Sequence, residues 1–212
     1  CFMDAGDLAR IFVAFGFLCP RDGEIIRGGQ CSCGYKPANR TSNILQQEAL
    51  RELAVTHTLK QSAGLIVLPT GAGKTRVSVR DVKRTEAKLC LYVAHSHEIL
   101  DNAEDEFLHE FPVETIARLP MAPNQDDLRR INLITIQSLA RNLDIFSGKT
   151  VDYMIVDEFH HAAAASYIKA VQALAPAFLL GLTATPFRGD RRDVTNLCGN
   201  NLIVFYELRQ GI

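Results

Sequence analysis

The chain has 212 residues, of which 47% are hydrophobic and 22% are charged, and its formal net charge is −1. These values allow one domain of generous size with a sizeable core. They exclude a basic field around the whole chain, so contact with a nucleic-acid backbone would depend on a narrow strip of donors. The apolar run Leu8 to Leu18 is too short to span a bilayer and lacks the features of a signal peptide. We therefore expect a cytoplasmic protein with no membrane contact.

The first 40 residues are predicted to form a small N-terminal appendage. Residues 20–41 are rich in Gly, polar residues and turn formers, which indicates a boundary. We therefore divide the chain into an appendage over residues 1–40 and a main domain over residues 41–212.

The appendage contains a candidate zinc site. Its two turn-like segments are CPRDG, with Asp22 where a zinc knuckle has its second Cys, and CSCG. A carboxylate is an acceptable zinc ligand, so one interpretation is a Zn²⁺ site. The candidate ligands are Cys19, Asp22, Cys31 and Cys33. The alternative is three reduced cysteines in a Gly-rich hairpin with no metal, and a disulfide is disfavoured in the cytoplasm.

Short apolar, β-rich runs alternate with helical stretches along the main domain. Strands are predicted at 64–68, 89–94, 132–136, 152–156, 178–182 and 202–205. Helices are predicted at 44–60, from 74 onward, and at 98–111, 136–143 and 161–174. This alternation predicts an α/β fold, with a parallel sheet that helices cover on both faces.

A phosphate-binding loop follows the first of these strands, in the order Leu68, Pro69, Thr70, Gly71, Ala72, Gly73, Lys74 and Thr75. Gly71 and Gly73 let the backbone curl so that successive N–H groups point at phosphate oxygens. Lys74 is expected to reach the β- and γ-phosphates, and the Thr75 hydroxyl to ligate Mg²⁺. A helix beginning at Lys74 favours anions at its positive end. Leu68 replaces the first Gly of the strict pattern, and the alternative is a turn that only connects a strand to a helix.

Two carboxylates, Asp157 and Glu158, follow the apolar strand 152–156. Open α/β sheets place ligand chemistry at the carboxyl ends of their strands. Asp157 is expected to hold Mg²⁺, and Glu158 to orient or deprotonate the water that attacks a γ-phosphate. The alternatives are solvated acids at a strand end, or a metal site that also uses His160 and His161.

A third apolar strand ends in Thr183-Ala184-Thr185. Small hydroxyl residues at this position can hydrogen-bond to the acids of the neighbouring strand and sense a γ-phosphate. Taken alone the segment is a weak signal, because strand ends rich in Thr are ordinary.

The segments LPTGAGKT, DEFH and GLTATP, in this order, resemble superfamily 2 helicases and translocases of the DExH-box type. The bacterial and phage-type members related to repair and restriction motors are most similar. The resemblance runs from about residue 41 to the end and implies a RecA-like lobe that binds ATP and Mg²⁺. It also implies that His160, Thr183, Ala184 and Thr185 couple the nucleotide state to movement.

The same resemblance implies further contacts outside the three motifs. Gln46 lies in a segment similar to the glutamine segment that contacts adenine. His95 and Ser96 lie in a segment similar to motif Ia, and Thr135, Gln137 and Ser138 in one similar to motif Ib or Ic. Both motifs face single-stranded nucleic acid in relatives. Ser96 stands where relatives often carry Arg, which puts one phosphate contact in question.

We therefore expect the ATP-binding motor lobe of a DNA or RNA helicase or translocase, with DNA as the favoured partner. In relatives a second RecA-like lobe supplies an arginine finger, worth about 10³ to 10⁵ in turnover. No segment of this chain matches that lobe, so we expect the chain to be nearly inactive alone. The alternatives are a nucleotide-gated nucleic-acid sensor, the motor subunit of a restriction enzyme, and a P-loop kinase, which would not need Thr183–Thr185 or the glutamine segment.

Overall fold

The computed structural model describes residues 17–18, 25–26, 40–162, 165–184 and 197–206, and side chains from residue 44 onward except that of His161. Residues 1–44 and 45–212 form two units. In the first, β1 (Phe17–Leu18) pairs antiparallel with β2 (Ile25–Ile26). None of the described helices is long and apolar enough to cross a membrane.

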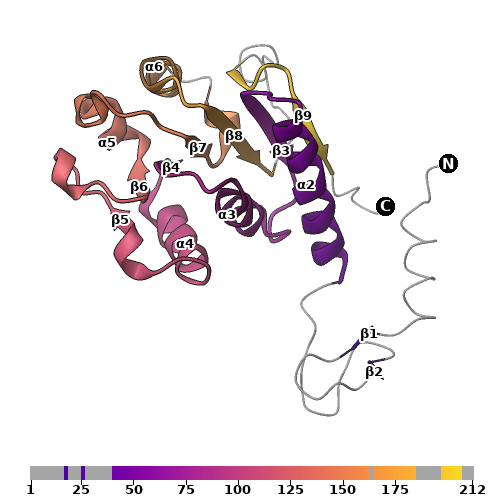
Figure 1. The fold of residues 1–212 in the computed structure, drawn as a ribbon. Helices are drawn as coiled ribbons and strands as arrows, with labels where there is room; N and C mark the ends of the chain where they lie inside the picture. The colour runs from indigo at the N-terminus through magenta and orange to yellow at the C-terminus, as the bar shows by residue number, and fades with distance from the viewer. Residues whose placement is uncertain (1–16, 19–24, 27–39, 163–164, 185–196, 207–212) are drawn as a thin grey trace. The chain divides into compact units, whose positions relative to one another are not determined.

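The second unit alternates strands and helices, as the sequence predicted (Figure 1). Its strands are β3 (Ala63–Val67), β4 (Cys90–Ala94), β5 (Ile116–Arg118), β6 (Ile131–Thr135), β7 (Tyr153–Val156), β8 (Phe178–Thr183) and β9 (Leu202–Phe205). Its α-helices are α2 (Arg40–Thr58), α3 (Lys74–Thr85), α4 (His97–Leu108), α5 (Ile136–Arg141) and α6 (Ala165–Leu174). Short 3₁₀ helices are η1 (Val113–Thr115), η2 (Gln125–Asp127), η3 (Leu143–Phe146) and η4 (Phe159–His161).

The strands form a seven-stranded sheet in the order β5-β6-β4-β7-β8-β3-β9. All pairs in this sheet are parallel. The carboxyl ends of β3, β7 and β8, which precede the three motifs, are therefore neighbours at one edge. The predicted α/β class is confirmed. The edge strand β5 was not predicted, because it has only three residues and none of them is fully buried.

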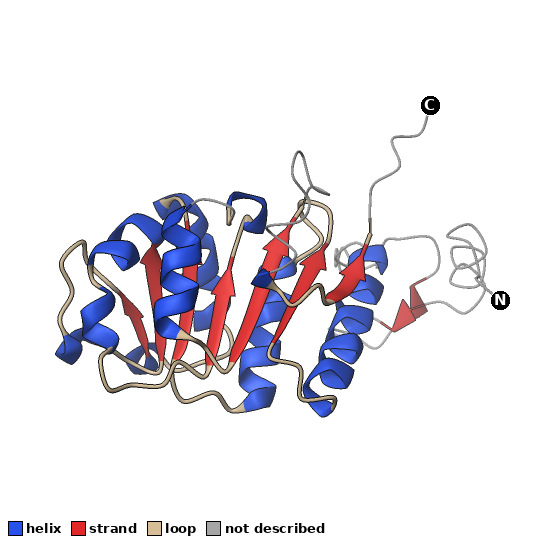
Figure 2. Cartoon of the chain, turned by 90° about the horizontal axis from the view of Figure 1, so that it is seen from above, coloured by secondary structure: helices blue, strands red, loops and turns tan. Residues whose placement is uncertain are grey.

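Two hydrophobic clusters, one on each face of the sheet, hold the helices in place (Figure 2). Alternate residues of one strand point to opposite clusters: Ile66 joins the cluster under α2, α3 and α4, whereas Leu65 and Val67 join the cluster under α5 and α6. Strands buried on both faces are typical of parallel sheets and explain the continuous apolar runs in the sequence. The helices thus cover both faces and leave the carboxyl edge for the motif loops.

Candidate functional site

The loop between β3 and α3 adopts a backbone that requires its two glycines. Gly71 and Gly73 have φ values of 78° and 81°, in the left-handed region that residues with a Cβ rarely adopt. A Cβ on Gly73 would also lie 2.3 Å from Nε2 of Gln46. A larger residue at either position would therefore strain the loop. At position 73 its side chain would also collide with Gln46 of α2. The backbone N–H groups at the start of α3 remain oriented for an anion.

Lys74, the first residue of α3, folds its side chain back across the loop. Its Nζ donates hydrogen bonds to the carbonyl oxygens of Leu68 at 3.2 Å and Pro69 at 3.4 Å. Burial lowers the pKa of Lys74, while the charges of Asp157 and Glu158 act in the opposite direction. The ammonium group is therefore partly desolvated and lies between the loop and the acid pair, where phosphate oxygens can replace the carbonyl acceptors.

Gln46 joins α2 to this loop. Its side chain is buried, and Nε2 donates to the carbonyl oxygen of Ala72 at 3.0 Å. The sequence predicted a contact with adenine, and the structure places the residue beside Gly73 of the phosphate loop.

Asp157 and Glu158 follow β7 at the same edge of the sheet. The Asp157 carboxylate is 7% exposed and accepts hydrogen bonds from the Tyr92 hydroxyl at 2.6 Å and from the Glu158 backbone N–H at 2.8 Å. Burial raises the pKa of Asp157, and these two bonds only partly offset it. Glu158 has a φ of 53°, a strained value of the kind that functional sites often hold.

Phe159 fixes the segment that carries these acids. Its ring is fully buried and lies against Gly181 of β8, where a Cβ would come within 2.7 Å of the ring. The glycine of GLTATP thus allows the chain after Glu158 to pack directly on the neighbouring strand. A side chain at Gly181 would displace Phe159 and the acids with it.

The third motif connects the other two. Thr183 ends β8, and its carbonyl oxygen accepts from the backbone N–H of Leu68 at 3.1 Å. Its hydroxyl lies 3.1 Å from Nδ1 of His160, which in turn lies 3.2 Å from Oε2 of Glu158. Ala184 follows and is partly exposed. Thr185 lies outside the described residues.

Tyr92 of β4 belongs to the site but was not predicted to. Its side chain is fully buried, and its hydroxyl donates to Asp157 at 2.6 Å. Burial, and then the charge of Asp157, raise the pKa of Tyr92 well above its usual value, so the hydroxyl stays neutral. Tyr92 therefore holds in place the carboxylate that is expected to ligate Mg²⁺. Only the order of strands, which places β4 beside β7, reveals this contact.

The segments expected to contact nucleic acid follow β4 and β6, which are neighbours in the sheet. Ser96 and Thr135 are N-caps whose side chains accept from the backbone N–H groups of Ile99 and Ser138. Ser138 is buried and its hydroxyl donates to the carbonyl oxygen of Pro120 at 3.0 Å. His95 and Gln137 are exposed. The three hydroxyl residues thus shape helix starts, while the two exposed side chains face solvent.

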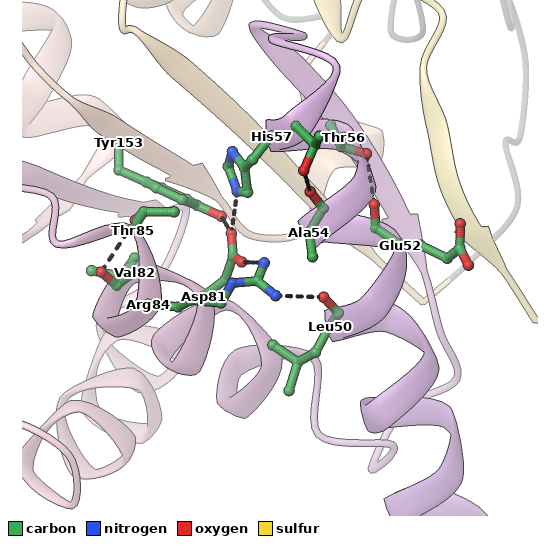
Figure 3. A network of polar contacts seen from close by, with 11 residues as sticks. Leu50, Glu52, Ala54, Thr56, His57, Asp81, Val82, Arg84, Thr85 and Tyr153 are labelled. Atoms are coloured by element: carbon green, nitrogen blue, oxygen red, sulfur yellow. Dashed lines mark hydrogen bonds and ion pairs between the residues drawn. The ribbon is translucent and has the colours of Figure 1, made fainter.

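A second polar cluster lies at the amino ends of the strands, opposite to the candidate site (Figure 3). The sequence analysis did not predict it. Its centre is Asp81 of α3, which is fully buried. Asp81 accepts from the Tyr153 hydroxyl at 2.6 Å, lies 2.8 Å from Nε2 of His57 and pairs with Arg84. Arg84 also donates to the carbonyl oxygen of Leu50 at 2.8 Å. The cluster joins α2, α3 and the first residue of β7.

Both metal-site alternatives include residues that the structure does not describe, among them the side chain of His161. Among the residues whose side chains are described, no group of three or more His, Cys, Asp or Glu could hold a metal ion by itself. The candidate zinc ligands Cys19, Asp22, Cys31 and Cys33 lie outside the described residues.

Comparison with known proteins identifies the family. Residues 41–188 match the family described as "Type III restriction enzyme, res subunit" (ResIII). The chain belongs to the ResIII family. This match covers the phosphate loop, the acid pair and the third motif. Together with the matches below, it confirms the resemblance to the N-terminal RecA-like lobe of superfamily 2 helicases.

Curated relatives are longer than this chain. The chain is 34% identical over 139 residues to DNA 3'-5' translocase XPB2 of Sulfurisphaera tokodaii, which covers 65% of the chain and 30% of the relative. It is 26% identical over 152 residues to putative helicase 109L of Invertebrate iridescent virus 3, which covers 68% of the chain and 46% of the relative. The chain therefore spans between about a third and a half of these relatives.

Solved structures with low sequence identity share the fold. The Hef helicase domain of Pyrococcus furiosus has a TM-score of 0.59 at 20% identity, over 76% of this chain and 38% of that one. The UvsW helicase from bacteriophage T4 has a TM-score of 0.58 at 15% identity, over 94% of this chain and 67% of that one.

Proposed function

We propose that this chain is the ATP-binding motor lobe of a DNA helicase or translocase. The observation that carries the proposal is the convergence of three motifs at one sheet edge: Lys74 lies between the phosphate loop and the acids, and Thr183 bonds to both neighbouring motifs. This arrangement supports nucleotide hydrolysis better than kinase chemistry, because Thr183 and His160 connect Glu158 to the phosphate loop, and a kinase would not need that connection.

Each residue receives a role from its place in this arrangement. The loop N–H groups and Lys74 bind the phosphates, and Gln46 keeps α2 against the loop beside the base. Thr75 and Asp157 would hold Mg²⁺, because both offer oxygen ligands: the half-buried Thr75 hydroxyl and the buried Asp157 carboxylate that Tyr92 holds in place. The ion, when bound, neutralises charge on the phosphate oxygens. Glu158 accepts a proton from, or orients, the attacking water.

Movement on nucleic acid would follow from coupling at the same edge. His160 contacts both Glu158 and Thr183, so a change at the γ-phosphate reaches the ends of β7 and β8. We place the nucleic-acid track along the loops after β4 and β6, with His95 and Gln137 as its exposed side chains. DNA is the favoured partner because the relative XPB2 is named a DNA translocase.

A second lobe is expected to complete the site. The curated relatives are longer than this chain, and an arginine finger supplied by another lobe is worth about 10³ to 10⁵ in turnover. We therefore propose that residues 41–212 alone bind Mg·ATP weakly and hydrolyse it barely. Brisk DNA-stimulated hydrolysis by the isolated chain would contradict this.

The roles are tested by Lys74→Ala and Glu158→Gln in the full-length protein. Each change is expected to lower DNA-stimulated ATP hydrolysis by at least about 10², the contribution of a positioned base or phosphate-binding group. Translocation along DNA is also expected to stop. It is measured by the displacement of a labelled third strand from the duplex. Lys169→Ala, at an exposed position on α6, is the matched control and is expected to have full activity. Full translocation by either site variant would refute the assignments.

A restriction motor is the second candidate, and the family description favours it. It differs from a repair helicase in requiring a nuclease that cuts DNA after ATP-driven movement. ATP-dependent cleavage of long DNA by the full-length protein would support it, and movement without cleavage would exclude it. Nucleotide-dependent DNA binding without movement would instead identify a sensor.

A further inference from the structure

Tyr167 of α6 carries a buried hydroxyl that the roles above do not use. Its side chain is 2% exposed, and its oxygen has no hydrogen-bond partner among the described residues. A buried hydroxyl that is left unpaired destabilises the folded state, because it loses its hydrogen bonds to water. Because folded proteins pair such groups with protein atoms or ordered water, Tyr167 requires a partner that the described chain does not supply.

The ring lies in the hydrophobic cluster that ends at the candidate site. This cluster contains Val67, directly before Leu68 and the phosphate loop, as well as Val156 and Phe159, which flank the two acids. Tyr167 therefore approaches the acids from the face of the sheet opposite to Tyr92, whose side chain belongs to the other cluster. Tyr92 and Tyr167 thus lie on opposite faces of the sheet whose strand β7 ends at the two acids.

The hydroxyl can act as a donor but not as a charged group. Burial, followed by the charges of Asp157 and Glu158, raises the pKa of Tyr167 to about 12. The phenol therefore keeps its proton at neutral pH. The charges of both carboxylates reach the hydroxyl although neither forms a direct hydrogen bond with it. A water molecule is a suitable partner for this hydroxyl, because it can bond one donor and two acceptors at once.

We propose that Tyr167 is a positioning residue for ATP hydrolysis, whose hydroxyl donates a hydrogen bond to a water molecule held between it and the carboxylates of Asp157 and Glu158. This inference rests on the proposed function. No covalent bond forms or breaks at Tyr167, and its proton stays on the phenol oxygen. The bridging water restrains Glu158, whose backbone is strained and whose carboxylate otherwise contacts His160 at 3.2 Å.

The test is Tyr167→Phe in the full-length protein, which removes one oxygen atom from a buried ring. We expect kcat for ATP hydrolysis to fall about tenfold, the usual effect of losing a group that orients a catalytic carboxylate. The KM for ATP and the affinity for a non-hydrolysable ATP analogue are expected to stay unchanged. Affinity for ADP with aluminium fluoride, which mimics the transition state, is expected to fall with kcat.

The matched control is Tyr153→Phe, which removes the same atom at the opposite edge of the sheet, where the hydroxyl bonds to Asp81. It is expected to leave kcat and both analogue affinities unchanged. An unchanged kcat in Tyr167→Phe would overturn the inference. A parallel loss of kcat and of affinity for both analogues would also overturn it, because general distortion produces that pattern. If the wild-type protein neither binds nor hydrolyses ATP, the proposed function itself fails.

Discussion

Two buried aspartates, Asp157 and Asp81, lie at opposite edges of one sheet, and each accepts a hydrogen bond from a tyrosine hydroxyl at 2.6 Å. Their surroundings differ in charge. Asp81 pairs with Arg84 and His57. Asp157 forms no ion pair within the described part of the chain, and burial raises its pKa.

This difference separates a structural carboxylate from one that is available to a ligand. Asp81 has its charge offset by Arg84, so it joins α2, α3 and β7 through contacts within the protein. Asp157 is held in place by Tyr92 and the Glu158 backbone, and the charge of Lys74 only partly compensates for its burial. A divalent ion would complete this compensation, so the folded chain keeps an unfavourable buried charge until the nucleotide and its metal arrive.

The largest expected contrast comes from Asp→Asn at the two positions. Asp81→Asn is expected to lower the free energy of unfolding by about 2 kcal/mol. That is less than the roughly 3–5 kcal/mol for a fully buried pair, because Arg84 and His57 are partly exposed and screened. Asp157→Asn is expected to raise the melting temperature of the nucleotide-free chain, since it removes a buried charge that Lys74 compensates only in part, and to abolish ATP hydrolysis. Thermal unfolding of both variants measures the contrast.

The control is to measure how the effect of Asp157→Asn on the melting temperature depends on pH. The pKa of Asp157 in the folded chain lies above its ordinary value of 3.8, so the folded state binds this proton more tightly than the unfolded state. The destabilisation by the charge is therefore absent below that value and grows as the pH rises through the folded pKa. The gain in melting temperature of the Asp157→Asn variant over the wild-type chain should shrink on acidification. A gain independent of pH would contradict the electrostatic explanation.

A smaller contrast comes from Tyr→Phe at the two capping tyrosines. Tyr92→Phe and Tyr153→Phe each remove one buried hydrogen bond to a carboxylate, at a cost of about 1–2 kcal/mol in stability. Only Tyr92→Phe is expected to change the metal requirement, raising the Mg²⁺ concentration for half-maximal hydrolysis by the full-length protein about tenfold. Titration of Mg²⁺ at fixed ATP measures this. Equal Mg²⁺ curves for the two variants would show that Tyr92 is only structural.

The features of the site that depend on local sequence could be predicted. The features that depend on the order of strands in the sheet could not. The glycines of the phosphate loop and the acids after an apolar strand could be identified, because the backbone and the strand end require them locally. The six predicted strands correspond to β3, β4, β6, β7, β8 and β9. Tyr92 could not be recognised as a site residue, because its contact with Asp157 spans 65 residues and depends on β4 lying beside β7.

The Asp81 cluster was missed for a related reason. A single Asp within the basic helix 74–85 looks like part of a solvated face, and its burial depends on α2 and β7 packing over it. Tyr167 looks like an ordinary aromatic residue of an amphipathic helix. Only the three-dimensional arrangement shows that its hydroxyl is unpaired. Polar groups buried by distant segments are therefore the part of this site that sequence patterns do not reveal.

The most direct test of the distinction between the two aspartates is the shift in melting temperature that ATP produces with and without Mg²⁺. A ligand present at 100 times its dissociation constant stabilises the folded state by about 2.7 kcal/mol. We predict that Mg²⁺ increases the ATP-induced shift of the wild-type chain and of Asp81→Asn by the same amount, and has no effect on that of Asp157→Asn. A full Mg²⁺-dependent shift in Asp157→Asn would contradict the assignment of Asp157 as the metal-binding carboxylate.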